Sequence, residues 1–303
     1  MRSRLAQIVV FATAGLFGGQ MPIHAQQADA PVISEVQDQS YCPRSSTSHE
    51  ALPAGPEVSI DNVSFSGFLQ MPISDQDKIA ASIRQEIHGD SLDGVIEEAL
   101  ERVRAGWQNR GYFKVQVSGD TRTLTKNAAD LHIALFVHVY ENLQYRLNEI
   151  TFKHSNVDIE VLRSLFPIKS GDIFNREKIA TGLENLRKAY GEMGYINFVA
   201  VPNTNSDDQK RMISLDIDLD SGKQFYVRSV NVLGLDEPAR QELARDLPIK
   251  VGQIYNSRLW ELSLLKHSSM FPDCACPHYQ PLGVDEQTGT VGLTLDFRPC
   301  SAN

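Results

Sequence analysis

Between residues 58 and 299 the hydrophobic positions follow either a strand-like or a helix-like periodicity. The same succession of these periodicities is repeated three times. Short stretches in which every second residue is apolar predict strands with one buried face. Longer stretches with apolar residues at i, i+4, i+7 and i+11 predict amphipathic helices. Each unit therefore has the order strand, helix, helix, strand, strand.

The second helix of each unit carries the clearest repeat. Its apolar positions have one spacing in all three units, which predicts that this face packs against a sheet. The positions are Ile96, Leu100, Val103 and Trp107 in the first unit, Ile179, Leu183, Leu186 and Tyr190 in the second, and Trp260, Leu264, His267 and Phe271 in the third. Only His267 departs from the apolar character of the set.

Two helices that cover one face of a small sheet make a stable two-layer unit. We therefore predict an α+β protein of three tandem two-layer domains, each β-α-α-β-β, with a three-stranded mixed sheet covered by two helices. The expected domains are residues 58–142, 143–222 and 223–303, and the third is degenerate.

The chain begins with the pattern of a secretory signal peptide, expected over residues 1–25. Arg2 and Arg4 precede an uncharged apolar run at residues 5–17. This run is shorter than the ~20 residues of a membrane-spanning helix, which disfavours the alternative of an uncleaved anchor. Residues 26–57 lack apolar periodicity and predict a disordered leader. The formal net charge of −9 gives no electrostatic reason to expect nucleic-acid binding.

Two further repeats connect the units. Residues 167–175 read PIKSGDIFN and residues 248–256 read PIKVGQIYN, and in both the Asn opens a helical pattern. The helices of the first two units are followed by Gly111-Tyr112 and Gly194-Tyr195. Glycine at this place accepts the left-handed conformation that closes a last helical turn, and we expect the aromatic residue to start the next strand.

With these motifs the chain resembles tandem POTRA (polypeptide-transport-associated) domains. Such domains form the periplasmic part of outer-membrane β-barrel assembly factors and two-partner secretion transporters. No run of alternating strands follows the third unit before Asn303, so we expect the binding function of these domains without the barrel. The resemblance implies a periplasmic location, or one peripheral to the outer membrane. It also implies as partner an outer-membrane β-barrel protein or an unfolded β-rich client.

The resemblance further implies that partners bind by strand addition to the strand after the second helix, which is an open sheet edge. Prolines disfavour this edge in the third unit, and the charge of Lys114 disfavours it in the first. We therefore expect the partner-binding edge strand at Tyr195, Ile196, Asn197, Phe198 and Val199. Secondary contacts are expected from Phe113, Val115, Val117 and Phe136, because residues 131–140 are apolar on both faces.

We find no residue pattern typical of an enzyme and expect no catalytic residue, cofactor or small-molecule substrate. One alternative function is a structural adaptor of a separate outer-membrane barrel. Another is a metal or redox protein that uses Cys274, Cys276 and His278, although an exported chain favours disulfides over thiolate ligands. A hairpin centred on residue 287 places Cys274 opposite Cys300, so we expect a disulfide there and no metal site, whereas the pairing of Cys42 and Cys276 stays open.

The disulfide can be tested on the secreted chain. We expect a non-reduced proteolytic digest to contain a peptide pair linked through Cys274 and Cys300 when analysed by mass spectrometry. Finding both residues as free thiols would contradict the hairpin register and favour the metal or redox alternative.

Overall fold

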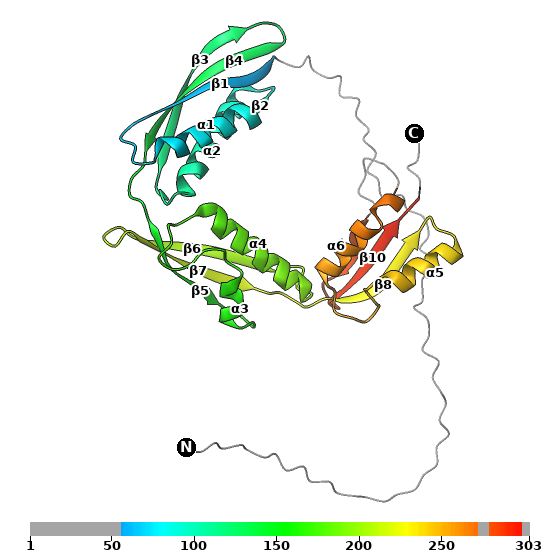
Figure 1. The fold of residues 1–303 in the computed structure, drawn as a ribbon. Helices are drawn as coiled ribbons and strands as arrows, with labels where there is room; N and C mark the ends of the chain where they lie inside the picture. The colour runs from blue at the N-terminus through cyan, green and yellow to red at the C-terminus, as the bar shows by residue number, and fades with distance from the viewer. Residues whose placement is uncertain (1–55, 272–278, 299–303) are drawn as a thin grey trace, which may run out of the picture. The chain divides into compact units, whose positions relative to one another are not determined.

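The computed structural model describes residues 56–271 and 279–298. Within these residues three separate sheets follow one another along the chain, and each takes its strands from one sequence unit (Figure 1). Apart from one additional two-residue strand, helices and strands follow in the order that the periodicity indicates. The prediction of an α+β protein made of three tandem two-layer domains is confirmed.

The first domain contains one strand more than expected. Its elements are β1 (Glu57–Ser66), α1 (Ile73–Glu86), β2 (His88–Gly89), α2 (Leu92–Gln108), β3 (Gln116–Lys126) and β4 (Asp130–Tyr140). The sheet order is β2-β1-β4-β3, in which β1 is parallel to β4 and β3 is antiparallel to it. The additional strand, β2, has two residues and pairs with the start of β1.

The other two domains have the expected three strands. The second consists of β5 (Arg146–Lys153), α3 (Ile159–Ser164), α4 (Arg176–Glu192), β6 (Val199–Asp207) and β7 (Met212–Asp220), with the sheet order β5-β7-β6. The third consists of β8 (Tyr226–Leu233), α5 (Glu237–Asp246), α6 (Ser257–Lys266), the 3-10 turn η1 (Ser268–Met270), β9 (Tyr279–Asp285) and β10 (Thr290–Asp296), with the order β8-β10-β9.

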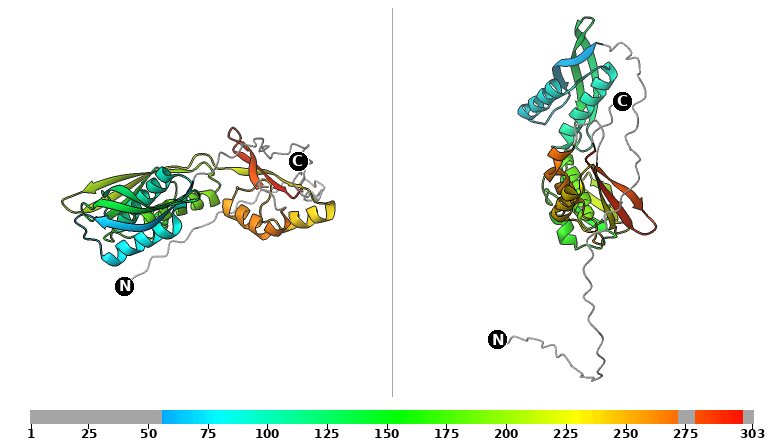
Figure 2. Two further views of the ribbon diagram at one scale, coloured as in Figure 1. Left: turned by 90° about the horizontal axis from the view of Figure 1, so that it is seen from above. Right: turned by 90° about the vertical axis from the view of Figure 1, so that its right-hand side faces the viewer.

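In each domain the two helices lie on one face of the sheet, and the core fills the space between these layers (Figures 1 and 2). The second helix of each sequence unit starts after a side chain that accepts a hydrogen bond from the backbone N–H three residues later. Ser91, Asn175 and Asn256 have this role and accept from Gly94, Lys178 and Leu259. These caps satisfy donors that the first helical turn leaves unpaired.

Helix α6, the second helix of the third domain, is shorter than the spacing of its apolar residues indicates. It ends at Lys266, so His267 is its C-cap and Phe271 lies beyond the 3-10 turn. The buried imidazole of His267 lies 2.7 Å from the Ser263 carbonyl and 3.1 Å from the Asp246 carboxylate. Phe271 still reaches the core, where its ring stacks on Phe297 at 4.7 Å.

The core face of α2 is rotated from the expected one. Its buried residues are Val95, Ala99, Val103 and Trp107, whereas Ile96 and Leu100 are only partly buried. Residues one position apart in a helix differ by ~100° in direction. The apolar stripe of this helix therefore extends beyond the core onto its flank.

A buried carboxylate connects two segments at one end of the first domain by hydrogen bonds. Glu141 is 3% exposed and accepts hydrogen bonds from the backbone N–H groups of Gln70 and Met71 and from the indole of Trp107. The donor distances are 2.6, 3.1 and 2.9 Å. A buried charge is tolerated only when such partners replace water. Glu141 thereby links the loop after β1 to helix α2.

The repeated nonapeptide lies where one domain follows another. A Cβ atom on Gly111 would lie 2.8 Å from the side chain of Ile173 and 2.9 Å from the Tyr145 carbonyl oxygen. Gly194 has the same relation to Ile254, at 2.7 Å, and both glycines have φ near +90°. The glycines are thus required by the helix end and by the close approach of the next domain.

Gly182 in α4 provides a test of core packing. Alanine normally favours a helix over glycine by ~1 kcal/mol, but a Cβ atom here would lie 2.1 Å from the Phe166 ring. We expect Gly182→Ala to destabilise the protein by ~1–3 kcal/mol in urea denaturation.

The matched control is Gly94→Ala in α2, where the nearest atom would be 3.6 Å away. This variant should be neutral or slightly stabilising. Equal effects of the two substitutions would show that the contact between Gly182 and Phe166 does not limit the packing.

Candidate partner-binding edge and groove

Each domain has an open strand edge at the same place in its fold. In the described residues, β3 pairs only with β4, β6 only with β7, and β9 only with β10. Their outer sides therefore present backbone N–H and C=O groups that another strand can pair with. These edge strands are the ones that follow the second helix of each domain.

The expected binding residues of the second domain mostly precede its edge strand. Tyr195 to Phe198 form a turn, in which the Phe198 N–H donates to the Tyr195 carbonyl at 3.2 Å. Only Val199 belongs to β6. The expectation that the aromatic residue starts the strand is wrong, because the chain first needs a turn to leave the helix end at Gly194.

The side chains of this turn already have partners within the chain. The Phe198 ring stacks on Tyr190 at 4.0 Å, and the Tyr195 hydroxyl accepts from Asn156 at 3.1 Å. Ile196 packs against the core of the third domain, and Asn197 donates to Glu286 at 2.7 Å. Val199, at 52% exposed, is the residue of the set that lies open on the edge strand.

Proline interrupts two of the three edges. Pro202 lies in the middle of β6 opposite Ile217, and Pro281 lies in β9 opposite Leu293. Strand β3 has eleven residues and no proline. Because proline has no N–H to donate, β3 offers the longest edge in which every residue has a donor. Its pairing with β4 has one irregularity, between Thr123 and Thr125.

Three of the four secondary residues contribute to packing. Phe113 and Val115 precede β3; Phe113 contacts Phe174 at a ring distance of 5.3 Å, and Val115 is buried. Val117 lies on β3 and packs against the core of the first domain. Phe136, on the sheet face away from the helices, is 43% exposed, and the Arg122 guanidinium lies 5.8 Å from its ring centre.

Helix α2 borders a groove on the side of the β3 edge. The groove is lined by Asp93, Ile96, Glu97, Leu100, Glu101 and Arg104. Leu100 reaches over β3, because a Cβ atom on Gly119 would lie 2.9 Å from it. On the other flank of α2, Gly106 lies against Ile79 of α1. The partly buried Ile96 and Leu100 therefore face the groove and the open edge.

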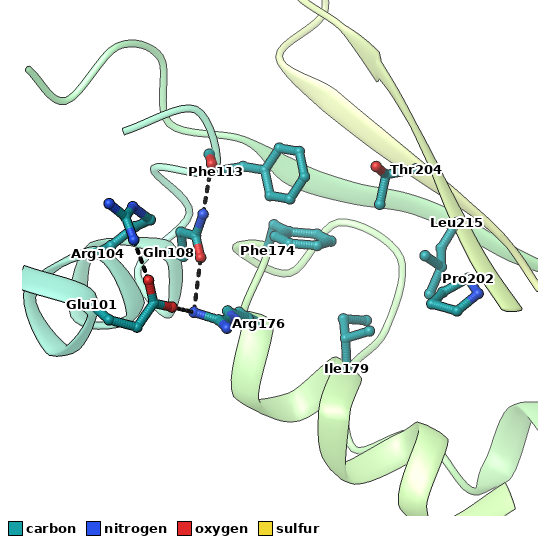
Figure 3. A pocket seen from close by; sticks show the side chains of 10 residues that line it. All are labelled: Glu101, Arg104, Gln108, Phe113, Phe174, Arg176, Ile179, Pro202, Thr204 and Leu215. Carbon is teal, nitrogen blue, oxygen red and sulfur yellow. Dashed lines mark hydrogen bonds and ion pairs between the residues drawn. The ribbon is translucent and has the colours of Figure 1, made fainter. Parts of the chain in front are cut away.

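A second cavity of 380 Å³ continues from this groove at the junction with the second domain (Figure 3). The two hollows share Glu101 and Arg104. The remaining lining residues of the cavity are Gln108, Phe113, Phe174, Arg176, Ile179, Pro202, Thr204 and Leu215. Pro202 and Thr204 belong to β6, so the cavity reaches the edge strand of the second domain. We call the two hollows together the α2 groove.

The charges of the α2 groove are separated along its length. At the junction end, Glu101 forms ion pairs with both Arg104 and Arg176, the latter at 2.7 Å, which leaves one net positive charge (Figure 3). The hydrogen bond from Arg176 lowers the pKa of Glu101 below its usual range. At the other end, Asp93 and Glu97 have no ion pair with the described residues.

The other predicted chemistry lies largely outside the described residues. Cys42, Cys274, Cys276, His278 and Cys300 are among the residues that are not described. The described part of the hairpin has the expected register, with Tyr279 opposite Leu295. Among the residues described, no group of three or more His, Cys, Asp or Glu side chains is arranged to hold a metal ion, and no helix is long and apolar enough to cross a membrane.

Comparison with known proteins identifies the domain type. The family model POTRA, "Surface antigen variable number repeat", matches residues 145–222. The fold is shared with the crystal structure of POTRA domains 3–5 of BamA from Haemophilus influenzae, at a TM-score of 0.58 and 20% identity over 82% of this chain and 98% of that one. The second domain matches the POTRA family, and the chain has the fold of tandem POTRA domains.

Curated proteins with similar sequences are much longer than this chain. The outer membrane protein assembly factor BamA of Buchnera aphidicola is 22% identical over 57% of this chain and 28% of its own length. A putative outer membrane protein assembly factor of Treponema pallidum is 26% identical over 66% of this chain and 26% of its own length. This chain thus spans about a quarter of the length of these relatives.

The groove predicts which apolar residues of the first domain contribute most to its stability. Ile96→Ala should cost less than about 1 kcal/mol, because Ile96 lines the groove, whereas Leu135→Ala in the fully buried centre of β4 should cost about 2–5 kcal/mol. Urea denaturation of both variants measures the difference. Equal losses would place Ile96 in the core and contradict the groove.

Proposed function

We propose that this chain is a periplasmic protein-interaction module in outer-membrane protein assembly or secretion, which binds an unfolded β-rich client or an outer-membrane β-barrel protein by strand addition. The tandem POTRA domains and the similarity to outer membrane protein assembly factors support the module and its compartment. The open edges support the mode of binding, since an extended polypeptide can continue a sheet through its backbone alone.

The observation that carries the proposal is the long, proline-free edge of β3. Its eleven residues contain no proline, while β6 and β9 each contain one. Lys114, which weighed against the first domain, lies before β3 and forms an ion pair with Asp208 at 2.7 Å. We therefore place the main binding edge on β3 and the secondary one on β6.

Single proline substitutions in β3 test this proposal. In an antiparallel pair, alternate residues direct their N–H groups outward, so one of Thr121→Pro and Arg122→Pro removes a donor from the open edge. That variant should lower the affinity for a urea-unfolded outer-membrane barrel protein by about tenfold, the value of roughly one hydrogen bond. Binding is measured by fluorescence anisotropy of the labelled barrel protein on dilution into the mature chain.

Thr121→Ala and Arg122→Ala are the matched controls, because they keep the backbone donors. Circular dichroism checks that all four variants are folded. If neither proline variant weakens binding while Asn203→Pro in β6 does, the main edge is in the second domain. If none of the three has an effect, binding does not use a sheet edge and the proposal fails.

A further inference from the structure

Helix α2 has apolar side chains that its own domain covers only in part. Ile96 and Leu100 are only partly buried, although they belong to the most regular apolar stripe in the sequence. Both face the α2 groove beside β3. A strand added to β3 would direct every second side chain toward the helix layer, and therefore into this groove.

The two ends of the groove differ in charge. Asp93 and Glu97 stand at the end near the start of α2, and they have no cationic partner in the part of the chain that the structure describes. Arg104 and Arg176 stand at the opposite end, where Glu101 balances only one of them. The groove is thus acidic toward the start of α2 and basic toward its end, with Ile96 and Leu100 interleaved between the charged residues.

The length of the groove fits a short stretch of strand. From Asp93 to Arg104 the helix rises about 17 Å, which equals about five residues of an extended chain. Side chain i of an added strand would therefore lie near Asp93, side chain i+2 near Ile96 and Leu100, and side chain i+4 near Arg104.

The direction of β3 determines the order in which a client presents these side chains. Leu100 lies over Gly119, and the chain turns back after α2, so β3 runs from the basic end of the groove toward the acidic end. A client strand paired antiparallel with β3 runs the opposite way. Antiparallel pairing is the slightly more stable arrangement per residue.

We propose that the α2 groove selects client strands with a basic residue at i, an apolar residue at i+2 and an acidic residue at i+4, added antiparallel to β3. This inference rests on the proposed strand addition and adds the chemistry of the client. Backbone pairing holds the strand, while the three groove positions determine which segment and which direction are preferred.

Two peptides of identical composition test the proposal. The first reads Thr-Lys-Thr-Leu-Thr-Glu-Thr and the second Thr-Glu-Thr-Leu-Thr-Lys-Thr, so they differ only in the order of the charges. Each is labelled with fluorescein, and its affinity for the mature chain is measured by anisotropy at low salt. The first peptide should bind about fivefold more tightly, and the preference should decline as the salt concentration rises.

Charge variants of the groove provide the second part of the test. The double variant Glu97→Lys with Arg104→Glu should reverse the preference. The matched control is Glu98→Lys, which makes the same charge change at an exposed position that does not line the groove, and it should leave the preference unchanged.

The outcomes separate this inference from the proposed function. Equal affinity of the two peptides, or a preference for the second peptide, would overturn the charge selection while strand addition to β3 stands. A preference that persists in the double variant would also overturn it, because the groove would not be its source. If neither peptide binds and the barrel protein does not bind either, both proposals fail. If only the barrel protein binds, the inference alone is refuted.

Discussion

Each domain depends on one central strand, which is the last strand of that domain in the sequence. Strands β4, β7 and β10 pair on both sides, parallel to the first strand and antiparallel to the edge strand of their domain. Their core-facing side chains are almost completely buried, as Leu135, Ile217 and Leu293 illustrate. The sheet and the helix layer are complete only when this strand is in place. Because it occupies the centre, the strand after the second helix is left at the edge.

The position of the edge strand matters both for the sheet and for its outer surface. An edge strand is needed to complete the sheet, yet its outer backbone groups stay unpaired within the domain. Proline in β6 and β9 reduces the capacity of two of these edges, while β3 keeps its full set of donors. The domains share a fold but differ in the number of backbone N–H groups on their open edge strands.

The role of an apolar residue on the flank of a helix depends on the elements that lie next to it. Ile96 and Leu100 are positioned beside an open edge, with acidic side chains at one end and arginines at the other. In α4, the corresponding stripe buries Ile179, Leu186 and Tyr190, and a glycine, Gly182, admits the Phe166 ring against the helix. Similar sequence patterns thus produce a packed flank in one domain and a groove in another.

The sequence by itself determined the class of fold, the order of elements and the helix starts, because these depend on local periodicity and on capping side chains such as Asn175 and Asn256. Tertiary structure decided the rest. A stripe of apolar residues predicts the buried face of a helix only to within one residue position. The positions of β3 and α1 therefore determined which flank of α2 is buried. The start of β6 at Val199 depended on the turn that packs Tyr195 and Phe198 against the core. The groove brings together residues that are far apart in the sequence, such as Glu101 and Arg176, which form an ion pair. A local sequence pattern cannot predict such a contact.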